Sequence, residues 1–248
     1  MDWTDDGIVL GARPYGEGSI IVSLLTRERG RHAGLVRGGA SGRSRGLYQA
    51  GNFVRASWRA RLSEHLGNFT CEMLTAQAAG YMDDPVKLAA LSSACAVADG
   101  SLPEREPHPA VYEGLLALIE LLDSDVWPAA YVKWEIGVLA DLGFGLDLSR
   151  CAATGLNDQL AYVSPRTGRA VSMSAGEPYR DRMLKLPGFL IGQGSYQTTD
   201  ILDGLEMTGH FLDRHVFGLQ NQPLPAARTR FIDRLKQSAT ISGGGDSE

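Results

Sequence analysis

Short apolar runs alternate with glycine-rich turns through the first 76 residues of the chain. Runs of this length, rich in β-branched residues and bounded by turns, are typical of β-strands. The second run follows the first after Gly16-Glu17-Gly18, a connection suited to a β-hairpin. The pattern predicts five strands, at residues 7–15, 19–26, 31–37, 52–62 and 67–75.

The fourth predicted strand alternates apolar residues with arginines. Side chains of a strand point alternately to its two faces, so we expect Arg55, Arg59 and Arg61 to share one solvated face. Arg43 and Arg45 lie in the glycine- and serine-rich loop before this strand, which can close over a bound polymer. Five short strands with glycine at the bends suit a small closed barrel, and the OB-fold is the five-stranded member of that group.

Beyond residue 85 the apolar positions recur with the period of an α-helix. We expect helices at residues 86–99, 110–122, 127–142, 200–217 and 225–236, and a loop-rich insert from Cys151 to about Gly176. Residues 238–248 contain three consecutive glycines and no apolar cluster, which predicts a disordered tail. The predicted fold class is a multidomain β + α protein, with an OB-fold barrel over residues 1–80 and an all-α domain over residues 81–237.

Composition narrows the class of protein. With 44% hydrophobic and 21% charged residues, the chain is typical of a globular protein rather than of a disordered or membrane protein. The longest apolar stretch, residues 114–122, is interrupted by Glu120 and is far shorter than the ~20 residues that span a bilayer. The first residues are acidic where a secretory signal is basic, and the three cysteines match no disulfide framework. We expect a cytoplasmic, nucleoid-associated protein with reduced thiols and no membrane partner.

Charge is distributed unevenly along the chain. The net charge is −5, yet residues 7–65 contain ten arginines and only three acidic residues, a local balance of +7 that leaves −12 for the rest. Such an asymmetry indicates a nucleic-acid surface on one domain, because several arginines on one face bind phosphates without reading the sequence. The candidate DNA-binding residues are Arg27, Arg29, Arg31, Arg37, Arg43, Arg45, Arg55, Arg59 and Arg61.

Other chemistry is sparse in the sequence. Single-strand binding also uses exposed rings, for which Tyr15, Tyr48 and Trp58 are candidates, with Trp58 expected in the core instead. No phosphate-binding loop, nucleophile elbow or zinc-protease motif is present, and the five histidines are scattered. We therefore expect no enzyme, no cofactor and no metal. The enzymatic alternative is a hydrolase site assembled from Asp83, Asp84 and His108.

Six segments resemble the RecO family of bacterial DNA repair and recombination mediators, in the same order along nearly the whole chain. They are Asp6-Gly-Ile-Val-Leu, Tyr15-Gly-Glu-Gly-Ser, Leu25-Thr-Arg-Glu-Arg-Gly-Arg-His, Val36-Arg-Gly-Gly-Ala, Leu142-Gly-Phe-Gly-Leu-Asp-Leu-Ser-Arg-Cys151 and Ala161-Tyr-Val-Ser-Pro-Arg-Thr-Gly-Arg-Ala170. The resemblance implies binding of single- and double-stranded DNA and annealing of complementary strands. It also implies that the protein, with RecR, helps load RecA onto DNA coated by single-strand-binding protein, and that RecF is a further partner.

The insert, residues 149–177, departs from the family pattern. Many family members hold zinc there through two CxxC pairs, whereas this chain keeps only Cys151, with Thr154, Ser172 and Ala175 at the other positions. Tetrahedral zinc needs four nitrogen or sulfur ligands, so we expect a metal-free insert that resembles a lost zinc finger. We expect the loop to be held instead by Pro165, Gly168, Gly176 and the packing of Leu160 and Tyr162.

The family also docks the acidic, apolar C-terminal tail of single-strand-binding protein on its helical domain. Such a peptide needs an apolar groove with a cation at its rim, and Lys133 beside Trp134 is the candidate by position. An RNA-binding factor that uses the same barrel stays open as an alternative, because OB-folds bind either polymer and the charge pattern does not distinguish them.

Overall fold

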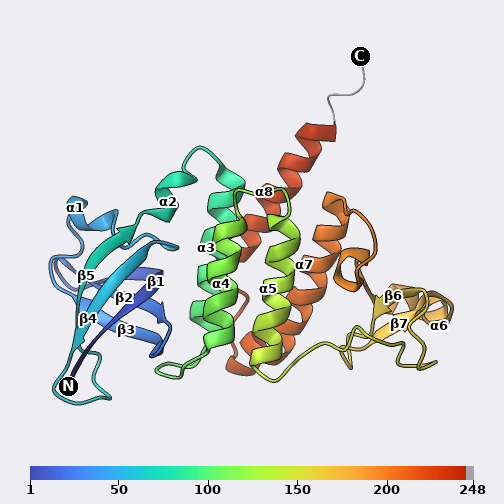
Figure 1. Ribbon diagram of the computed structural model, residues 1–248, viewed down its shortest axis with the longest axis horizontal. Coiled ribbons are helices and arrows are strands. Elements are labelled where there is room, and N and C mark those ends of the chain that lie inside the picture. The colour runs from blue at the N-terminus through green and yellow to red at the C-terminus, as the bar shows by residue number, and fades with distance from the viewer. Residues whose placement is uncertain (244–248) are drawn as a thin grey trace. The chain divides into compact units, whose positions relative to one another are not determined.

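The computed structural model describes residues 1–243, with the side chains of Arg43, Arg45 and residues 241–243 excepted. Packing divides the described residues, whose helices and strands are labelled in Figure 1, into two compact units: residues 1–119 with 225–238, and residues 120–224 with 239–243. The predicted boundary between residues 80 and 81 falls between the last barrel strand, which ends at Thr75, and the long helix that begins at Pro85, and as a domain boundary it stays a prediction. None of the described helices is long and apolar enough to cross a membrane.

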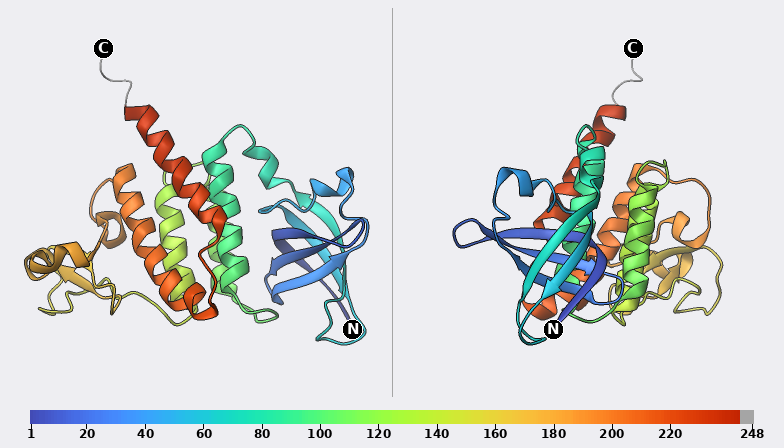
Figure 2. Two further views of the ribbon diagram at one scale, coloured as in Figure 1. Left: turned by 180° about the vertical axis from the view of Figure 1, so that it is seen from behind. Right: turned by 60° about the vertical axis from the view of Figure 1, so that its left-hand side comes forward.

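Five strands close into a barrel in the first unit, in the order β1-β2-β3-β5-β4 (Figure 2). Their bounds are β1 Asp2–Tyr15, β2 Ser19–Thr26, β3 Gly30–Val36, β4 Phe53–Arg59 and β5 Asn68–Thr75. Neighbours are antiparallel except β3 and β5, which meet through the single parallel pair Leu35 and Asn68. The predicted five-stranded barrel is confirmed. β1 begins earlier than predicted, because its first half pairs with β4 and its second half with β2.

The barrel is filled by the inward side chains of alternate strand positions. On β4 the burial alternates residue by residue, with Val54, Ala56 and Trp58 inside. They pack with Val9, Val22, Leu24 and Phe69. Gly34 leaves room on β3 for the ring of Phe69, since a Cβ at this position would clash with that ring.

The buried side-chain amide of Asn52 holds the connection between β3 and β4 in place through hydrogen bonds. This connection contains the one-turn helix α1 Gly42–Arg45, and a second short helix, α2 Gln77–Gly80, follows β5. Asn52 donates to the carbonyl of Gly46 at 2.8 Å, and its side-chain oxygen accepts from the backbone N–H of Ala78 at 3.1 Å. Neither short helix was predicted, because four residues are too few for a periodic apolar pattern.

Three longer helices belong to the first unit, α3 entirely and α4 and α8 for most of their length. Of these, α3 packs against β1 and β2. They are α3 Pro85–Ser101, α4 Pro109–Leu121 and α8 Ala226–Gly243. Asp84 begins α3 by accepting hydrogen bonds from the backbone N–H groups of Val86 and Lys87.

The predicted tail is partly wrong. The prediction ended the last helix at residue 236, but α8 continues to Gly243. Phe231 and Leu235 anchor this helix in the core, and a helix so anchored continues through polar residues until the glycines. Residues 244–248 of the predicted tail lie outside the described residues.

In the second unit α5 Trp127–Asp141 packs beside α7 Thr198–Leu212. Gly204 of α7 allows the close approach, since a Cβ there would come within 2.9 Å of Val132. Glu135 of α5 is fully buried and accepts a hydrogen bond from the hydroxyl of Thr208 of α7. The predicted helix at 200–217 is α-helical only in its first part, because α7 passes into the π-turn η3 Asp213–Phe217 and the 3₁₀ turn η4 Gly218–Gln220.

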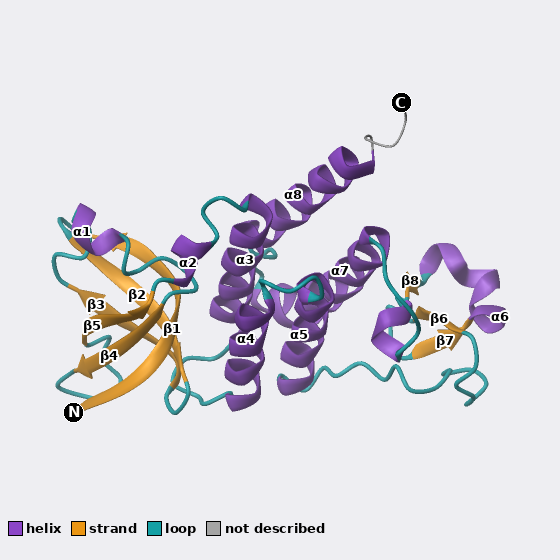
Figure 3. Cartoon of the chain, turned by 45° about the horizontal axis from the view of Figure 1, so that its top comes forward, coloured by secondary structure: helices purple, strands orange, loops and turns teal. Residues whose placement is uncertain are grey.

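The insert is more ordered than predicted. It contains a small sheet in the order β7-β6-β8, joined by short helical turns (Figure 3). The strands are β6 Leu160–Val163, β7 Ala170–Ser172 and β8 Leu184–Lys185, and the turns are α6 Met173–Gly176, η1 Glu177–Arg182 and η2 Gly188–Ile191. Strands of two to four residues carry too little alternation for the sequence to reveal them.

Candidate nucleic-acid interface

The outer face of β4 presents the arginines that the alternation predicts. Arg55 and Arg59 point outward between buried neighbours, and both are exposed. Arg61 is exposed too, but it lies in the turn that follows β4, which ends at Arg59. The structure therefore places two of the three on one strand face and the third just beyond its end.

Arg55 is paired across the barrel surface. It stands opposite Asp6 of β1, and its Nε and Nη2 donate to the two carboxylate oxygens of Asp6 at 2.8 and 3.1 Å. These hydrogen bonds, followed by the charge of Asp6, raise the pKa of Arg55. A guanidinium in a bidentate pair has less to offer a phosphate than an unpaired one.

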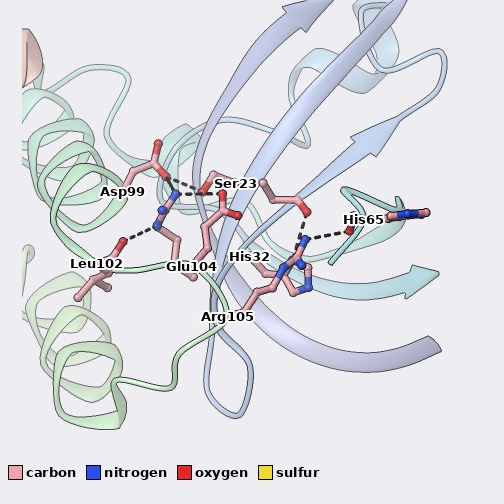
Figure 4. Close-up of polar contacts among 9 residues, drawn as sticks. Ser23, His32, His65, Asp99, Leu102, Glu104 and Arg105 are labelled. Carbon is pink, nitrogen blue, oxygen red and sulfur yellow. Dashed lines mark hydrogen bonds and ion pairs between the residues drawn. The ribbon is translucent and has the colours of Figure 1, made fainter. Parts of the chain in front are cut away.

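Arg31 is committed to contacts within the first unit. Its Nε donates to the carbonyl oxygen of Leu102 at 2.7 Å, and its Nη1 lies 3.4 Å from Asp99 and 3.5 Å from Glu104. Asp99 also accepts a hydrogen bond from Ser23 of β2 at 2.5 Å (Figure 4). With only 19% of its side chain exposed, Arg31 joins α3 and the segment after it to the barrel.

Arg27 also contacts a helix, through an ion pair and an aromatic ring. Its Nη1 lies 2.9 Å from the carboxylate of Glu113, and its guanidinium lies 5.3 Å from the centre of the Tyr112 ring. Both partners belong to α4. Arg27 remains more than half exposed, so solvent still reaches its charge.

Four of the candidate arginines are exposed and form no ion pair or side-chain hydrogen bond with any described residue. They are Arg29, Arg37, Arg59 and Arg61. Arg43 and Arg45 have backbone in α1, and their side chains lie outside the described part of the chain. Arg29, Arg37, Arg59 and Arg61 are called the exposed arginines below.

The charge of the barrel is smaller than the sequence window suggests. The predicted balance of +7 was counted from Gly7, but the barrel begins at Asp2 and ends near residue 76. Residues 1–76 contain the same ten arginines and seven acidic residues, a balance of +3. Of the four additional acidic residues, Asp2, Asp5 and Asp6 precede the apolar run that marked the first strand in the sequence, and Glu72 lies on β5.

The candidate aromatic platforms differ in how far their side chains are exposed. Tyr15 is 53% exposed at the end of β1, whereas Tyr48 is 8% exposed and packs in the barrel core. Trp58 lies in the core, as expected, and donates from Nε1 to the carbonyl of Leu66 at 2.9 Å. Trp3, which was not a candidate, packs against that core and remains partly exposed. The signal that could have found it is the alternation of Trp3 with the polar Asp2 and Thr4, which extends the first strand.

The residues of the insert do not fit a zinc ion. At Cys151, Thr154, Ser172 and Ala175, the four positions where the resemblance leads one to expect cysteines, this chain offers one thiol, two hydroxyl groups and a side chain with no donor atom. Cys151 is fully buried and accepts from the backbone N–H of Ser172 at 3.2 Å, while the two side chains lie 3.4 Å apart. Within residues 1–243 no group of three or more His, Cys, Asp and Glu side chains is arranged to hold a metal.

Hydrogen bonds lower the pKa of the buried thiol of the insert, Cys151. Burial by itself raises the pKa of Cys151, but hydrogen bonds from Ser172 and Thr154 outweigh it and lower the pKa to about 6. The other two cysteines behave in the opposite way, because burial raises the pKa of Cys71 to about 11 and that of Cys95 to about 12. Thr154 and Ser172 thus form a hydrogen-bonded cluster around the sulfur of Cys151.

Comparison with known families and proteins covers both units. The family model described as Recombination protein O N terminal matches residues 1–76, and the one described as Recombination protein O C terminal matches residues 82–222. The DNA repair protein RecO of Rhodospirillum centenum is 59% identical over 98% of both chains. Those of Phenylobacterium zucineum and Rhodospirillum rubrum are 51% and 49% identical, over 97% and 96% of this chain and 100% and 97% of their own.

The chain belongs to the RecO family. It is a DNA repair and recombination protein and not an enzyme, which removes the hydrolase alternative. In this RecO chain Asp84 serves as the N-cap of α3, and Asp83 is exposed to solvent beside it.

The predicted partner site lies in the second unit of this RecO chain. Lys133 on α5 is exposed, whereas Trp134 is only 6% exposed and its ring meets Tyr131 edge-on at 5.9 Å. The Nε1 of Trp134 is buried and has no hydrogen-bond partner among the described residues. The lysine is thus available to a ligand, while the indole belongs to the helix packing.

Proposed function

We propose that this protein binds single- and double-stranded DNA on its barrel and anneals complementary strands. With RecR it helps load RecA onto DNA coated by single-strand-binding protein. The observation that carries the proposal is the set of exposed arginines on a small domain of positive net charge. Unpaired guanidinium groups are the strongest attractors of phosphate available to the described barrel.

The mechanism is electrostatic. Two DNA strands repel each other through their phosphates, and arginines between them reduce that repulsion long enough for bases to pair. Contacts to phosphate do not read the sequence, so any complementary pair is a substrate. The process needs no nucleotide and no cofactor.

Strand annealing tests the role of the exposed arginines. We expect the triple variant Arg37→Gln, Arg59→Gln, Arg61→Gln to slow annealing of complementary oligonucleotides roughly tenfold or more, because three phosphate contacts are lost. A matched control removes the same charge from the second unit, where Arg150, Arg166 and Arg182 are exposed. An equal loss in the control and the barrel variant would show that net charge, and not the barrel, determines annealing.

The RNA alternative has its own test. Matched DNA and RNA oligonucleotides compete for the full chain, and we expect DNA to displace RNA more effectively than the reverse. RNA that competes at least as well as DNA would favour an RNA-binding factor built on the same barrel.

We further propose that the C-terminal tail of single-strand-binding protein docks at Lys133, through the charge of Lys133 and the terminal carboxylate of the tail, while the neighbouring Trp134 supports the helix from within. Lys133→Glu is expected to weaken binding of a tail peptide, measured by calorimetry, while Lys133→Arg retains it. Unchanged affinity in Lys133→Glu would place the tail elsewhere. RecF is a further proposed partner beside RecR and RecA, and the proposed location is the cytoplasm, associated with the nucleoid.

A further inference from the structure

Trp3 covers an aromatic cluster of the barrel. It stands opposite Trp58 in the pairing of β1 with β4, and the two rings are nearly parallel, with centroids 5.9 Å apart and planes at 18°. His32 of β3 lies 5.1 Å from the Trp3 ring, and Phe69 of β5 meets it edge-on at 5.8 Å. Trp58, His32 and Phe69 are at most 4% exposed, whereas Trp3 is partly exposed. Among these four rings, Trp3 is therefore the one that a ligand can reach.

Two hollows of the barrel surface share Trp3 and Trp58 in their walls. The first has a volume of about 510 Å³ and is also lined by Arg29, His32 and Arg105. The second has a volume of about 470 Å³ and is also lined by Arg59 and Asn68. The first is large enough for a nucleobase beside the aromatic rings. The second lies on the outward face of β1 and β4, where Thr4, Ser57 and Arg59 point away from the face of the Trp58 ring, and it offers polar contacts to the neighbouring part of a strand.

One exposed arginine belongs to each hollow. Arg29 lines the first and Arg59 the second, and neither has a carboxylate partner among the described residues. Arg105 differs from them, because its Nη1 and Nη2 donate to the carbonyl oxygens of Ser63 and His65 at 2.5 and 2.8 Å. Figure 4 shows Arg105 beside His32 at the barrel. Arg105 thus forms a fixed part of the wall, while Arg29 and Arg59 are available to a ligand.

The His32 ring adds to the apolar wall. Burial is the largest cause that lowers the pKa of His32, and the positive charges of Arg105 and Arg29 act in the same direction. The carbonyl of Ala33 and the carboxylate of Glu104 oppose the shift without cancelling it. The ring is therefore neutral at physiological pH, and the cluster presents no cation of its own.

Two carboxylates decide which part of a nucleic acid the hollows accept. Asp2 lines both hollows and Glu28 lines the first. Carboxylates repel a phosphate but accept hydrogen bonds from the amino and imino groups of a base. A neutral base is thus favoured inside, and the phosphates on either side of it are left to the exposed guanidinium groups.

We propose that Trp3 is a stacking platform for one unpaired base of a DNA strand, with Arg29 and Arg59 binding the phosphates that flank this base. The inference rests on the proposed function, since the strand must already be held on the barrel. Stacking tolerates any sequence because every base has a π face. Bases in a duplex are already stacked on their neighbours, so the site favours single-stranded over double-stranded DNA.

Oligonucleotides with and without bases separate stacking from phosphate binding. An oligothymidylate and an oligonucleotide of equal length made of abasic residues carry the same phosphates. We expect the wild-type full chain to bind the thymidylate roughly five- to a hundredfold more tightly. Trp3→Leu is expected to remove most of this preference and to leave the affinity for the abasic strand unchanged. Trp3→Phe is expected to retain most of it, because it keeps a ring.

Controls separate stacking from a structural role of Trp3. Tyr179→Leu removes an exposed ring of the second unit that lines neither hollow, and it is expected to keep the wild-type preference. Thermal unfolding of each variant establishes that it is folded. Should Trp3→Leu fail to fold, tryptophan fluorescence replaces it. The thymidylate then quenches the wild type more strongly than Trp3→Phe, and the abasic strand does not.

Each outcome decides between the two proposals. A folded Trp3→Leu that keeps the wild-type preference for bases overturns the stacking site while leaving DNA binding by the barrel intact. Equal loss of affinity for both strands overturns it as well, since Trp3 would then only support the arginines. Absence of wild-type binding to either strand at low salt overturns the proposed function, and the stacking site with it.

Discussion

Arginines that look alike in the sequence differ in what they contact. Arg31 and Arg59 both lie on predicted strands of the basic segment, yet Arg31 meets Asp99 and Glu104 while Arg59 has no acidic partner among the described residues. Alternation on one strand predicts that a side chain points outward. It does not reveal a carboxylate about 70 residues away that the fold brings to the same place. The exposure of Arg59 was therefore predictable, and the internal use of Arg31 was not.

This difference predicts that substitution of Arg31 lowers stability far more than substitution of Arg59. Arg31→Gln is expected to lower the free energy of unfolding by about 1–3 kcal/mol, because it leaves the carbonyl of Leu102 and the carboxylate of Asp99 poorly satisfied. Arg59→Gln is expected to change it by less than about 0.5 kcal/mol. Urea denaturation of both variants measures the difference. Equal stabilities would contradict the assignment of Arg31 to the packing.

Cys151 predicts a pH dependence of stability. Its pKa in the folded chain, about 6, lies below the value of 9.0 for an ordinary thiol, so the unfolded state holds a proton that the folded state has released. The resulting stabilisation is fully present above pH 9 and is lost as the pH falls towards 6. The free energy of unfolding of the wild type minus that of Cys151→Ser should therefore increase from pH 6 to pH 9. A difference that stays constant over this range would show that the thiol keeps its proton.

At the scale of elements, the period of the apolar pattern determined what the sequence could predict. Strands β2 to β5, the second half of β1 and the helices α3, α4 and α5 were predicted close to their bounds because each is long enough to show its period. The small sheet of the insert was missed because its strands span two to four residues. The first residues of β1, Asp2–Asp6, were missed as a strand for a different reason. The alternation of Trp3 with Asp2 and Thr4 spans three residues beside two further aspartates, which is too short a signal to predict a strand at Asp2–Asp6 without its pairing with β4.

Asn52 predicts how the elements at one end of the barrel depend on each other. It is 1% exposed and its amide joins the loop after α1 to the start of α2 through Gly46, Leu47 and Ala78. Asn52→Ala is expected to lower the free energy of unfolding by about 2–4 kcal/mol, because it leaves buried backbone groups without partners. The exposed Asn68→Ala serves as the control. Denaturation that shows less than about 0.5 kcal/mol for Asn52→Ala would mean that water replaces the amide at no cost.

At the scale of the whole molecule, the net charge of −5 does not show that the barrel carries a positive charge, and the barrel is the proposed DNA-binding surface. Electrostatic fields are screened over about 8 Å at physiological ionic strength, so DNA on the barrel responds to the charges near it and not to the total. The sequence revealed this segregation but overstated it, since the acidic start of β1 and Glu72 of β5 reduce the barrel from +7 to +3. The exposed arginines, and not the net charge of the barrel, therefore carry the proposed binding.

The salt dependence of DNA binding by the full chain tests this proposal most directly. The logarithm of the affinity for a single strand falls linearly with the logarithm of salt concentration, with a slope of about 0.7 per phosphate contacted. The variant with glutamine at Arg37, Arg59 and Arg61 is expected to reduce that slope by about two units, while the control with glutamine at Arg150, Arg166 and Arg182 keeps the wild-type slope. A barrel variant whose slope equals that of the wild type would contradict phosphate binding by the exposed arginines.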